Sequence, residues 1–424
     1  GIGVSALAKY YLSQGAKISG SDLESSEITE ELKKDGTQIY IGKHKKSFLS
    51  KDAKIVIYTA ATPKDNPELK EAKSRKLKVQ SYPEAVGELT EKYKTITVSG
   101  AHGKSTTTAL TALVLEEGYF DPTVIVGTKI KEFGYSNFRK GLGTYLVLEA
   151  DEWNRSFLEY SPTIAVVTNI DAEHLDTYKT VIEVEKTFEK FISRVSLGGK
   201  IIANADDERL KKVAKKFGKK VRWYSLNDRE ALTLRKILCP PGEHNVSNAL
   251  AALNVGRELG IAEAHILKAI SRFSGAWRRF EFKGRVNGAY IFSDYGHHPT
   301  EIRATILAAR ERFPFRRVWC VYQPHQYQRL SYLWDDFVAA FDMADRICLL
   351  PVYDVAGRET KRAKALVNSF KLSRALLKKD KGAHYFGTFL DAKKFIYDNA
   401  HPGDVILVMG AGDIYNLSNM LSAS

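Results

Sequence analysis

A glycine-containing segment near residue 100 has the residue types needed to hold a phosphate: Gly100-Ala101-His102-Gly103-Lys104-Ser105-Thr106. The β-branched run at 95–98 predicts a strand before it, and the apolar spacing over 106–117 predicts a helix after it. Backbone N–H groups at such a helix start attract an anion, Lys104 can reach a phosphate, and the Ser105 hydroxyl can ligate Mg²⁺. We therefore predict an ATP site, the alternative being an ordinary strand–turn–helix with a surface lysine.

Two later apolar runs, at 145–148 and 163–170, are followed by acids and one histidine. These residues are Glu149, Asp151, Glu152, Asp171, Glu173, His174 and Asp176. Ligands of open parallel sheets lie at the carboxyl ends of strands, so these side chains are expected at the same rim as the phosphate loop. Mg²⁺ prefers oxygen ligands, which makes Glu149 the first candidate and His174 the second. The alternative is a set of solvated strand ends.

A second polar cluster is predicted in the last third of the chain, where strands are expected at 289–294, 317–322, 345–350 and 404–409. The polar residues that follow the first two of these strands are Tyr295, His297, His298, Gln323, His325, Tyr327 and Arg329. A single histidine beside an apolar strand is usually structural. Several histidines with an arginine at neighbouring strand ends favour a functional site.

The alternation of strands and helices predicts an α/β protein with doubly wound sheets. At the start of the chain, a turn with Gly1 and Gly3, a helix and a strand ending at Asp22 follow the Rossmann-type arrangement for a nucleotide diphosphate. The strand that should precede this turn is expected to be missing from the sequence. We predict three domains, at 1–92, 93–274 and 275–424, with an irregular polar stretch at 226–240.

The segment that follows this stretch predicts a loop and then an alanine-rich helix. His244 and Asn248 are four residues apart and share a helix face. They could hydrogen-bond an adenine edge, the alternative for Asn248 being a capping or packing role.

Composition narrows the class of protein. A chain of 424 residues with a formal charge of +14 suits several domains and either a nucleic-acid partner or anionic small substrates. Nucleic acid is disfavoured because no basic-aromatic recognition motif accompanies the lysines. Cys239, Cys320 and Cys348 are expected to be reduced and buried, and no apolar run is long enough to span a bilayer. These features indicate a cytoplasmic protein that is not inserted in a membrane.

Ten segments in this order resemble the Mur ligase family over nearly the whole chain. They are the segments at 1–3, 19–22, 100–108, 149–152, 168–176, 244–249, 278–280, 294–301, 323–329 and 409–413. Within the family, they are most similar to the ligases that join L-alanine to UDP-N-acetylmuramate. The resemblance implies a Rossmann-like UDP-sugar domain, a central P-loop ATPase domain and a Rossmann-like C-terminal domain that brings the amino acid.

The resemblance also implies the reaction and its residues. The lactyl carboxylate of UDP-N-acetylmuramate attacks ATP in the presence of Mg²⁺, and L-alanine then attacks the acyl phosphate. The implied catalytic residues are Lys104, Arg278, Arg279 and His297. The implied ATP contacts are the loop at 100–106 with His244 and Asn248, and the implied metal ligands are Ser105, Glu149 and His174. The implied UDP-sugar contacts are Gly1, Gly3, Asp22, Asp151 and Glu152. The implied contacts of the muramoyl group and the amino acid are Tyr295, His297, His298, His325 and Arg329.

Two alternatives to this activity stay open at the level of sequence. One is the recycling ligase that attaches a tripeptide to the same nucleotide sugar. The other, from a different class, is a basic P-loop protein that binds nucleic acid. A monomer or a homodimer is expected.

Overall fold

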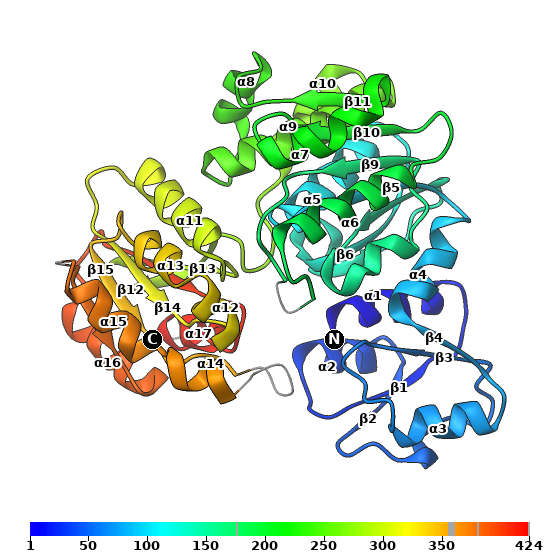
Figure 1. The fold of residues 1–424 in the computed structure, drawn as a ribbon, viewed down its shortest axis with the longest axis horizontal. Coiled ribbons are helices and arrows are strands. Elements are labelled where there is room, and N and C mark those ends of the chain that lie inside the picture. Colours follow the sequence, from blue (N-terminus) through cyan, green and yellow to red (C-terminus); the bar gives the residue numbers. More distant parts are fainter. Residues whose placement is uncertain (175–176, 355–360, 380, 423–424) are drawn as a thin grey trace. The chain divides into compact units, whose positions relative to one another are not determined.

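A computed structural model describes residues 1–174, 177–354, 361–379 and 381–422 (Figure 1). These residues form two compact units. The first unit contains residues 1–237 and 247–273, and the second contains residues 238–246 and 274–424. Each unit is an α/β structure with its own large, mostly parallel sheet.

The beginning of the first unit has four short strands and four helices. The strands are β1 (Ser19–Asp22), β2 (Gln38–Ile41), β3 (Ile55–Tyr58) and β4 (Lys78–Ser81). The helices are α1 (Ile2–Ser13), α2 (Glu27–Lys34), α3 (Pro67–Ser74) and α4 (Tyr82–Thr90). The strands form two separate parallel pairs, β1 with β2 and β3 with β4.

The rest of the first unit is built on a seven-stranded sheet with the order β11-β10-β9-β5-β8-β6-β7. Its strands are β5 (Lys94–Ser99), β6 (Thr123–Ile130), β7 (Ser136–Arg139), β8 (Tyr145–Glu149), β9 (Ile164–Val167), β10 (Lys200–Asn204) and β11 (Val221–Tyr224). Its helices are α5 (Lys104–Glu117), α6 (Val181–Ser193), α7 (Glu208–Ala214), α8 (Glu230–Ile237), α9 (Glu243–Glu258) and α10 (Glu263–Arg272). All described pairs are parallel except β6 with β7. Because β5 lies between β8 and β9, the loop after β5 shares its sheet edge with both strand ends.

The second unit has a six-stranded sheet with the order β12-β13-β17-β14-β15-β16. Its strands are β12 (Glu281–Val286), β13 (Ala289–Asp294), β14 (Val318–Tyr322), β15 (Arg346–Leu349), β16 (Ala383–Tyr385) and β17 (Val405–Met409). Its helices are α11 (Pro299–Arg312), α12 (Tyr327–Tyr332), α13 (Trp334–Ala340), α14 (Lys361–Leu366), α15 (Ser369–Leu377), α16 (Phe389–Asn399) and α17 (Tyr415–Ser422). Among the strands in the described part of this unit, only β12 is antiparallel to its neighbour.

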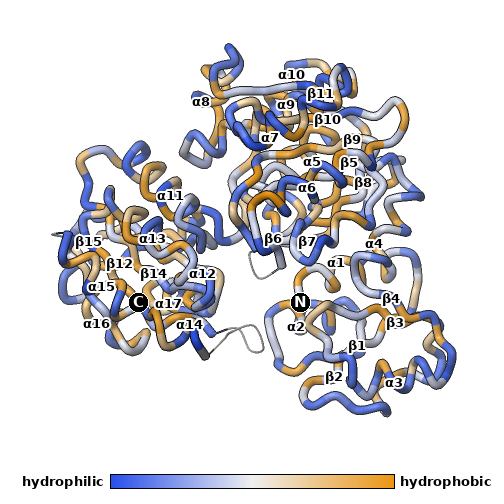
Figure 2. Tube along the Cα trace, viewed as in Figure 1, coloured by the Kyte–Doolittle hydropathy of each residue, from blue (hydrophilic) through white to orange (hydrophobic). Residues whose placement is uncertain are grey.

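Hydrophobic residues follow the strands of the two large sheets (Figure 2). Strands β9, β14 and β17 are buried along their whole length, as expected for strands covered on both faces. Within the described ranges, no helix has the length and apolar character needed to cross a bilayer. The surface lysine Lys212 of α7 pairs with Glu185, and Lys216, just after α7, pairs with Glu189.

The α/β class is confirmed. The predicted domains at 1–92 and 93–274 fall almost entirely in the first compact unit, and the predicted domain at 275–424 falls in the second. Two local expectations need correction. The stretch at 226–240 contains the helix α8, whose Ala231 and Leu234 are buried. Cys239 is exposed, whereas Cys320 and Cys348 are buried thiols as expected. Strands β6, β7, β12 and β16 were not predicted. The strands β7, β12 and β16 are short or polar and partly exposed, whereas the apolar run of β6 is interrupted at Gly127.

Candidate active site

The loop between β5 and α5 is a close-fitting turn built on two glycines. Gly100 and Gly103 have φ values of +138° and +83°, which favour glycine. A Cβ on Gly100 would lie 2.1 Å from the Thr168 hydroxyl, and one on Gly103 would lie 2.3 Å from Oδ1 of Asn248. At positions 100 and 103 the backbone therefore lies too close to Thr168 and Asn248 for a residue with a side chain.

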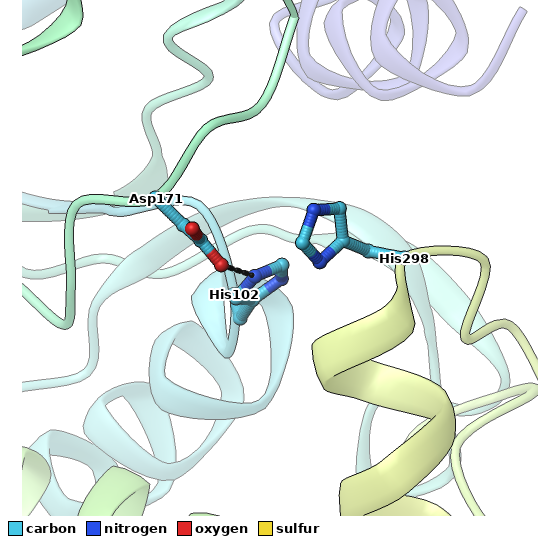
Figure 3. Close-up of side chains that lie close together, drawn as sticks. All are labelled: His102, Asp171 and His298. Atoms are coloured by element: carbon cyan, nitrogen blue, oxygen red, sulfur yellow. Dashed lines mark hydrogen bonds and ion pairs between the residues drawn. The ribbon is translucent and has the colours of Figure 1, made fainter. Parts of the chain in front are cut away.

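The end of β9 fastens this loop through side chains. Oδ1 of Asn169 accepts from the His102 N–H at 2.9 Å, while Asn169 Nδ2 and the Thr168 hydroxyl donate to the His102 carbonyl at 3.0 and 2.6 Å. Nε2 of His102 lies 3.0 Å from the Asp171 carboxylate (Figure 3). Thr168 and Asn169 lie in the segment at 168–176, which the sequence analysis singled out for its acidic residues. Their hydrogen bonds to the His102 backbone were not foreseen. Leu175 and Asp176 of that segment lie outside the described residues.

Lys104 is the cation of the loop and is surrounded by acceptors. Its Nζ donates to the two Glu152 oxygens at 2.9 and 3.1 Å and to the Gly100 carbonyl at 2.7 Å. Burial alone would lower the pKa of Lys104, but the charges of Glu152 and Asp151 outweigh burial and raise the pKa. The ammonium is therefore charged at the pH of the cell and is held at the start of α5.

Glu152 forms an ion pair with Lys104 and also contacts His174. The side chain is 1% exposed, and its Oε1 lies 3.4 Å from Nε2 of His174. Burial would raise the pKa of Glu152, but Lys104 and His174 lower it to about 2. The same contact overcomes burial and raises the pKa of His174. Ligand atoms of Asp151, Glu152 and His174 lie within 4.8 Å of one another, which is close enough for one metal ion.

Glu149 and Ser105 form a second group of oxygen donors beside Lys104. Glu149 accepts the Gly127 N–H at 2.7 Å and a hydrogen bond from the Ser105 hydroxyl. Burial raises the pKa of Glu149, while Gly127 and Lys104 act to lower it. Carboxylate and hydroxyl oxygens are what Mg²⁺ prefers, so this pair fits the metal that the sequence predicts. The third predicted ligand, His174, lies with Glu152 instead.

The two residues predicted for adenine both lie on α9 in different surroundings. Oδ1 of Asn248 accepts from the Thr107 hydroxyl at 3.1 Å, which ties α9 to α5. His244 is exposed at the start of α9, and partial desolvation of its ring together with the charge of Arg279 lowers its pKa to about 4. Its imidazole is therefore neutral at pH 7 and can both donate and accept a hydrogen bond.

Three of the five residues predicted for the nucleotide sugar lie at the start of the chain's first helix and at the end of its first strand. Gly1 caps α1, Gly3 lies in its first turn, and Asp22 ends β1. The Asp22 carboxylate accepts the N–H of Leu23 at 2.8 Å. The other two predicted contacts, Asp151 and Glu152, lie beside Lys104.

In the second unit, the end of β13 and the start of α11 fix His297 and His298. Glu301 accepts the backbone N–H of His297 at 2.9 Å and that of His298 at 3.2 Å, and His298 caps α11. Nδ1 of His297 lies 3.1 Å from the Tyr295 carbonyl and 3.4 Å from Glu301. With two oxygens beside it, Nδ1 carries the proton of the neutral ring, and Nε2 is the basic nitrogen.

The end of β14 brings His325 and Arg329 to the same place. The His297 and His325 rings are 5.7 Å apart, and His325 stacks on Tyr353 at 5.6 Å. Nη1 of Arg329 lies 3.3 Å from Nδ1 of His325 and donates to its carbonyl at 3.2 Å. The structure therefore gathers His297, His325 and Arg329, which the sequence placed at separate strand ends.

The adjacent arginines Arg278 and Arg279 differ in their partners. Arg278 is 7% exposed, its Nη2 donates to the carbonyls of Gly410 and Gly412, and its guanidinium lies 5.0 Å from the Tyr295 ring. Burial lowers the pKa of Arg278. Arg279 instead donates to Glu301 at 3.3 Å. The chain's own carbonyls and rings thus hold Arg278, while Arg279 is paired with an acid.

Gln323 was singled out in the sequence, but its contact with Asp413 between β14 and β17 was not foreseen. The side chain of Gln323 donates to Asp413 at 2.9 Å and accepts the Ile414 N–H at 3.1 Å. Both residues lie in segments singled out in the sequence, at 323–329 and 409–413. Their pairing depends on β14 lying beside β17, which the chain order alone does not give.

Family models match three consecutive stretches of the chain. The Mur ligase family catalytic domain matches residues 1–94, the Mur ligase middle domain matches 98–256, and the Mur ligase glutamate ligase domain matches 278–412. The chain belongs to the Mur ligase family.

Individual relatives are similar over the whole chain. A protein named UDP-N-acetylmuramate–L-alanine ligase from Alkaliphilus metalliredigens is 36% identical, with 100% of this chain and 95% of the relative covered. One of the same name from Clostridium botulinum is 38% identical over 99% of this chain and 95% of its own. The solved structure of UDP-N-acetylmuramate–alanine ligase MurC from Thermotoga maritima has a TM-score of 0.82 and 27% identity, covering 99% of this chain and 96% of that one.

Proposed function

We propose that this protein joins L-alanine to the lactyl carboxylate of UDP-N-acetylmuramate with the hydrolysis of ATP. The observation that carries the proposal is the full-length similarity, at 36–38% identity, to proteins named UDP-N-acetylmuramate–L-alanine ligase. The cation and acids around the glycine loop support it independently, because Lys104, Ser105 and Glu149 are what a metal-bound triphosphate needs. ATP and nucleotide sugars are substrates found inside the cell, so we place the reaction in the cytoplasm.

The first step activates the carboxylate. A lactyl carboxylate oxygen attacks the γ-phosphorus of ATP, the bond to the bridging oxygen breaks, ADP leaves and an acyl phosphate forms. Both reactants are anionic, so Lys104 neutralises charge that gathers at the γ-phosphate. Ser105 and Glu149 would hold Mg²⁺, and the ion would neutralise phosphate charge when bound. Backbone N–H groups of the loop at 100–106 receive the phosphates.

The second step forms the amide bond. The amine of L-alanine attacks the acyl carbon, the C–O bond to phosphate breaks, and inorganic phosphate leaves. Nε2 of His297 is the basic nitrogen of a ring oriented by Tyr295 and Glu301, so His297 accepts the amine proton. The fork of Arg329 suits the carboxylate of alanine, and His325 holds that arginine in place.

The remaining contacts bind the two nucleotides. The neutral imidazole of His244 and the amide of Asn248 would read the adenine edge of ATP. The start of α1 at Gly1 and Gly3 would receive the diphosphate of the sugar nucleotide, and Asp22 would accept from its ribose.

Phosphate release measures the proposed reaction directly. The protein is incubated with ATP, Mg²⁺ and UDP-N-acetylmuramate, and the amino acid is varied. Release is expected with L-alanine and not without UDP-N-acetylmuramate. Release with the cell-wall tripeptide but not with L-alanine would assign the recycling reaction instead, and release that needs neither would overturn both.

A further inference from the structure

The hairpin of β6 and β7 packs against α1, the first helix of the chain (Figure 2). Ala6, Leu7 and Tyr10 of α1 are buried in the same hydrophobic core as Ile125 of β6 and Leu146 of β8. The helix that begins at the predicted diphosphate turn is therefore packed on the sheet that carries the glycine loop. A residue of the hairpin that touches the first turn of α1 can fix the place of that turn.

Asn137 of β7 makes this contact. Its side chain is 3% exposed, and Nδ2 donates to the Ile2 carbonyl at 2.7 Å and to the Ser5 hydroxyl at 2.9 Å. The Ser5 hydroxyl itself donates to the Ile2 carbonyl at 2.7 Å. Both amide protons of Asn137 are thus used on the first turn of α1, directly beside Gly1 and Gly3. Ile2 and Ser5 are two points on that turn, so the contact fixes its direction as well as its distance.

Lys129 of β6 makes a second, ionic contact with the same part of the molecule. Its side chain is 4% exposed, and Nζ pairs with Glu27 at 2.6 Å and with Glu31, both of α2. Glu31 also accepts from Lys9 of α1, and Lys9 donates to the Ser136 hydroxyl at 3.3 Å. A buried ammonium must be paired, so this cluster holds α2 as Asn137 holds α1.

The same hairpin also reaches the phosphate end of the site. Gly127 of β6, two residues before Lys129, donates its N–H to Glu149 at 2.7 Å. One short hairpin therefore contacts a predicted metal ligand on one side and the predicted diphosphate turn on the other. We propose that Asn137, supported by Lys129, is a positioning residue that sets the sugar nucleotide relative to the glycine loop. It acts through the α1 turn, and the inference rests on the proposed function.

The test compares two isosteric substitutions, Asn137→Asp and Asn254→Asp. A carboxylate at position 137 would face the Ile2 carbonyl with no proton to donate. Asn254 is a matched control, because it is 6% exposed and its Nδ2 donates to the Leu250 carbonyl at 2.9 Å, within α9. We expect Asn137→Asp to raise the KM for UDP-N-acetylmuramate by about 10-fold or more and to leave the KM for ATP within about 2-fold. Asn254→Asp should lower the melting temperature without changing the KM for UDP-N-acetylmuramate.

The outcomes separate the inference from the proposed function. Calorimetry without ATP measures binding of UDP-N-acetylmuramate to each variant. If the unmodified protein does not bind it, the proposed function fails and the inference fails with it. If it binds, and Asn137→Asp binds as tightly or loses ATP affinity equally, the inference alone is wrong.

A milder variant decides the matter if Asn137→Asp does not fold. Glu31→Gln keeps the size of the side chain and removes one of the charges that hold Lys129. We expect a rise of about 2- to 5-fold in the KM for UDP-N-acetylmuramate with an unchanged KM for ATP. An unchanged KM for both substrates would overturn the inference.

Discussion

The polar cluster of the first unit is mainly acidic, whereas that of the second unit is mainly basic. The acidic centre of the first unit consists of Glu149, Asp151, Glu152 and His174 around a single lysine, Lys104. The basic centre of the second unit has mostly cationic groups. It consists of Arg278, Arg279, Arg329, His297 and His325, with Glu301 as their acidic partner.

This difference in charge indicates which substrate groups each centre can bind. Acids around one ammonium accept a divalent cation and the phosphates that it carries. Arginines held by carbonyls, rings and one glutamate accept carboxylates. A ligase that activates one carboxylate with ATP and orients a second on an amino acid needs both kinds of centre. Substitutions in one centre should therefore change the use of ATP, and those in the other should change the use of the amino acid.

The largest effect is expected from Lys104→Ala in the acidic centre. Loss of the cation that faces the transferred phosphate should lower kcat by about 10³-fold or more, while binding of UDP-N-acetylmuramate stays nearly unchanged. Phosphate release and calorimetry measure the two quantities. The exposed Lys212 provides a control, because Lys212→Ala should keep full activity. If Lys104→Ala keeps its turnover, the glycine loop does not take part in the reaction.

A smaller loss is expected from Glu149→Gln. The amide oxygen can still accept the Gly127 N–H, but the negative charge that attracts Mg²⁺ is gone. We expect kcat to fall by about 10²-fold and the Mg²⁺ concentration needed for half-maximal rate to rise. A magnesium titration of phosphate release checks both. An unchanged magnesium requirement would show that Glu149 does not hold the metal.

The basic centre should respond to Arg329→Lys through the amino acid. Lysine keeps the charge but loses the two parallel hydrogen bonds of the guanidinium. We expect the KM for L-alanine to rise by about 10-fold, with the KM values for ATP and UDP-N-acetylmuramate unchanged. Steady-state kinetics with each substrate varied in turn test this. A rise in the KM for ATP instead would contradict the assignment of ATP to the acidic centre and of the amino acid to the basic centre.

The smallest effect concerns stability against pH and is confined to the Lys104–Glu152 pair. The folded-state pKa of Glu152, about 2, lies below its usual value of 4.5. Its ionised form therefore stabilises the fold above pH 4.5, and this stabilisation is lost as the pH falls toward 2. Glu152→Gln should be less stable than the unmodified protein by about 3 kcal/mol at pH 7, and the gap should close in acid. Urea unfolding at several pH values checks this, and a gap independent of pH would contradict it.

Local features were predictable from the sequence. The glycine loop lies between β5 and α5 as expected, because a β-branched run, two glycines and an apolar helix face are all encoded within about 25 residues. Four of the parallel strands of the second unit, β13, β14, β15 and β17, were likewise found from their apolar runs, whereas the three-residue β16 was not. The helix α8 was missed although Ala231 and Leu234 have helical spacing, since polar residues surround them.

Features that depend on distant contacts were not predictable. Nothing near Glu152 in the sequence indicates that its carboxylate pairs with a lysine 48 residues earlier. The proximity of His297 to His325 depends on β17 being inserted between β13 and β14, although β17 comes last in the chain. The partner of Asn137 is the first turn of α1, 135 residues away, so its proposed role became visible only in the structure.

Isotope transfer tests most directly whether ATP activates the lactyl carboxylate as an acyl phosphate. UDP-N-acetylmuramate is labelled with ¹⁸O in both lactyl carboxylate oxygens and is turned over with ATP and L-alanine. If the carboxylate becomes an acyl phosphate, each released phosphate carries one ¹⁸O atom, which mass spectrometry detects. Phosphate without ¹⁸O, formed together with the amide product, would contradict this mechanism.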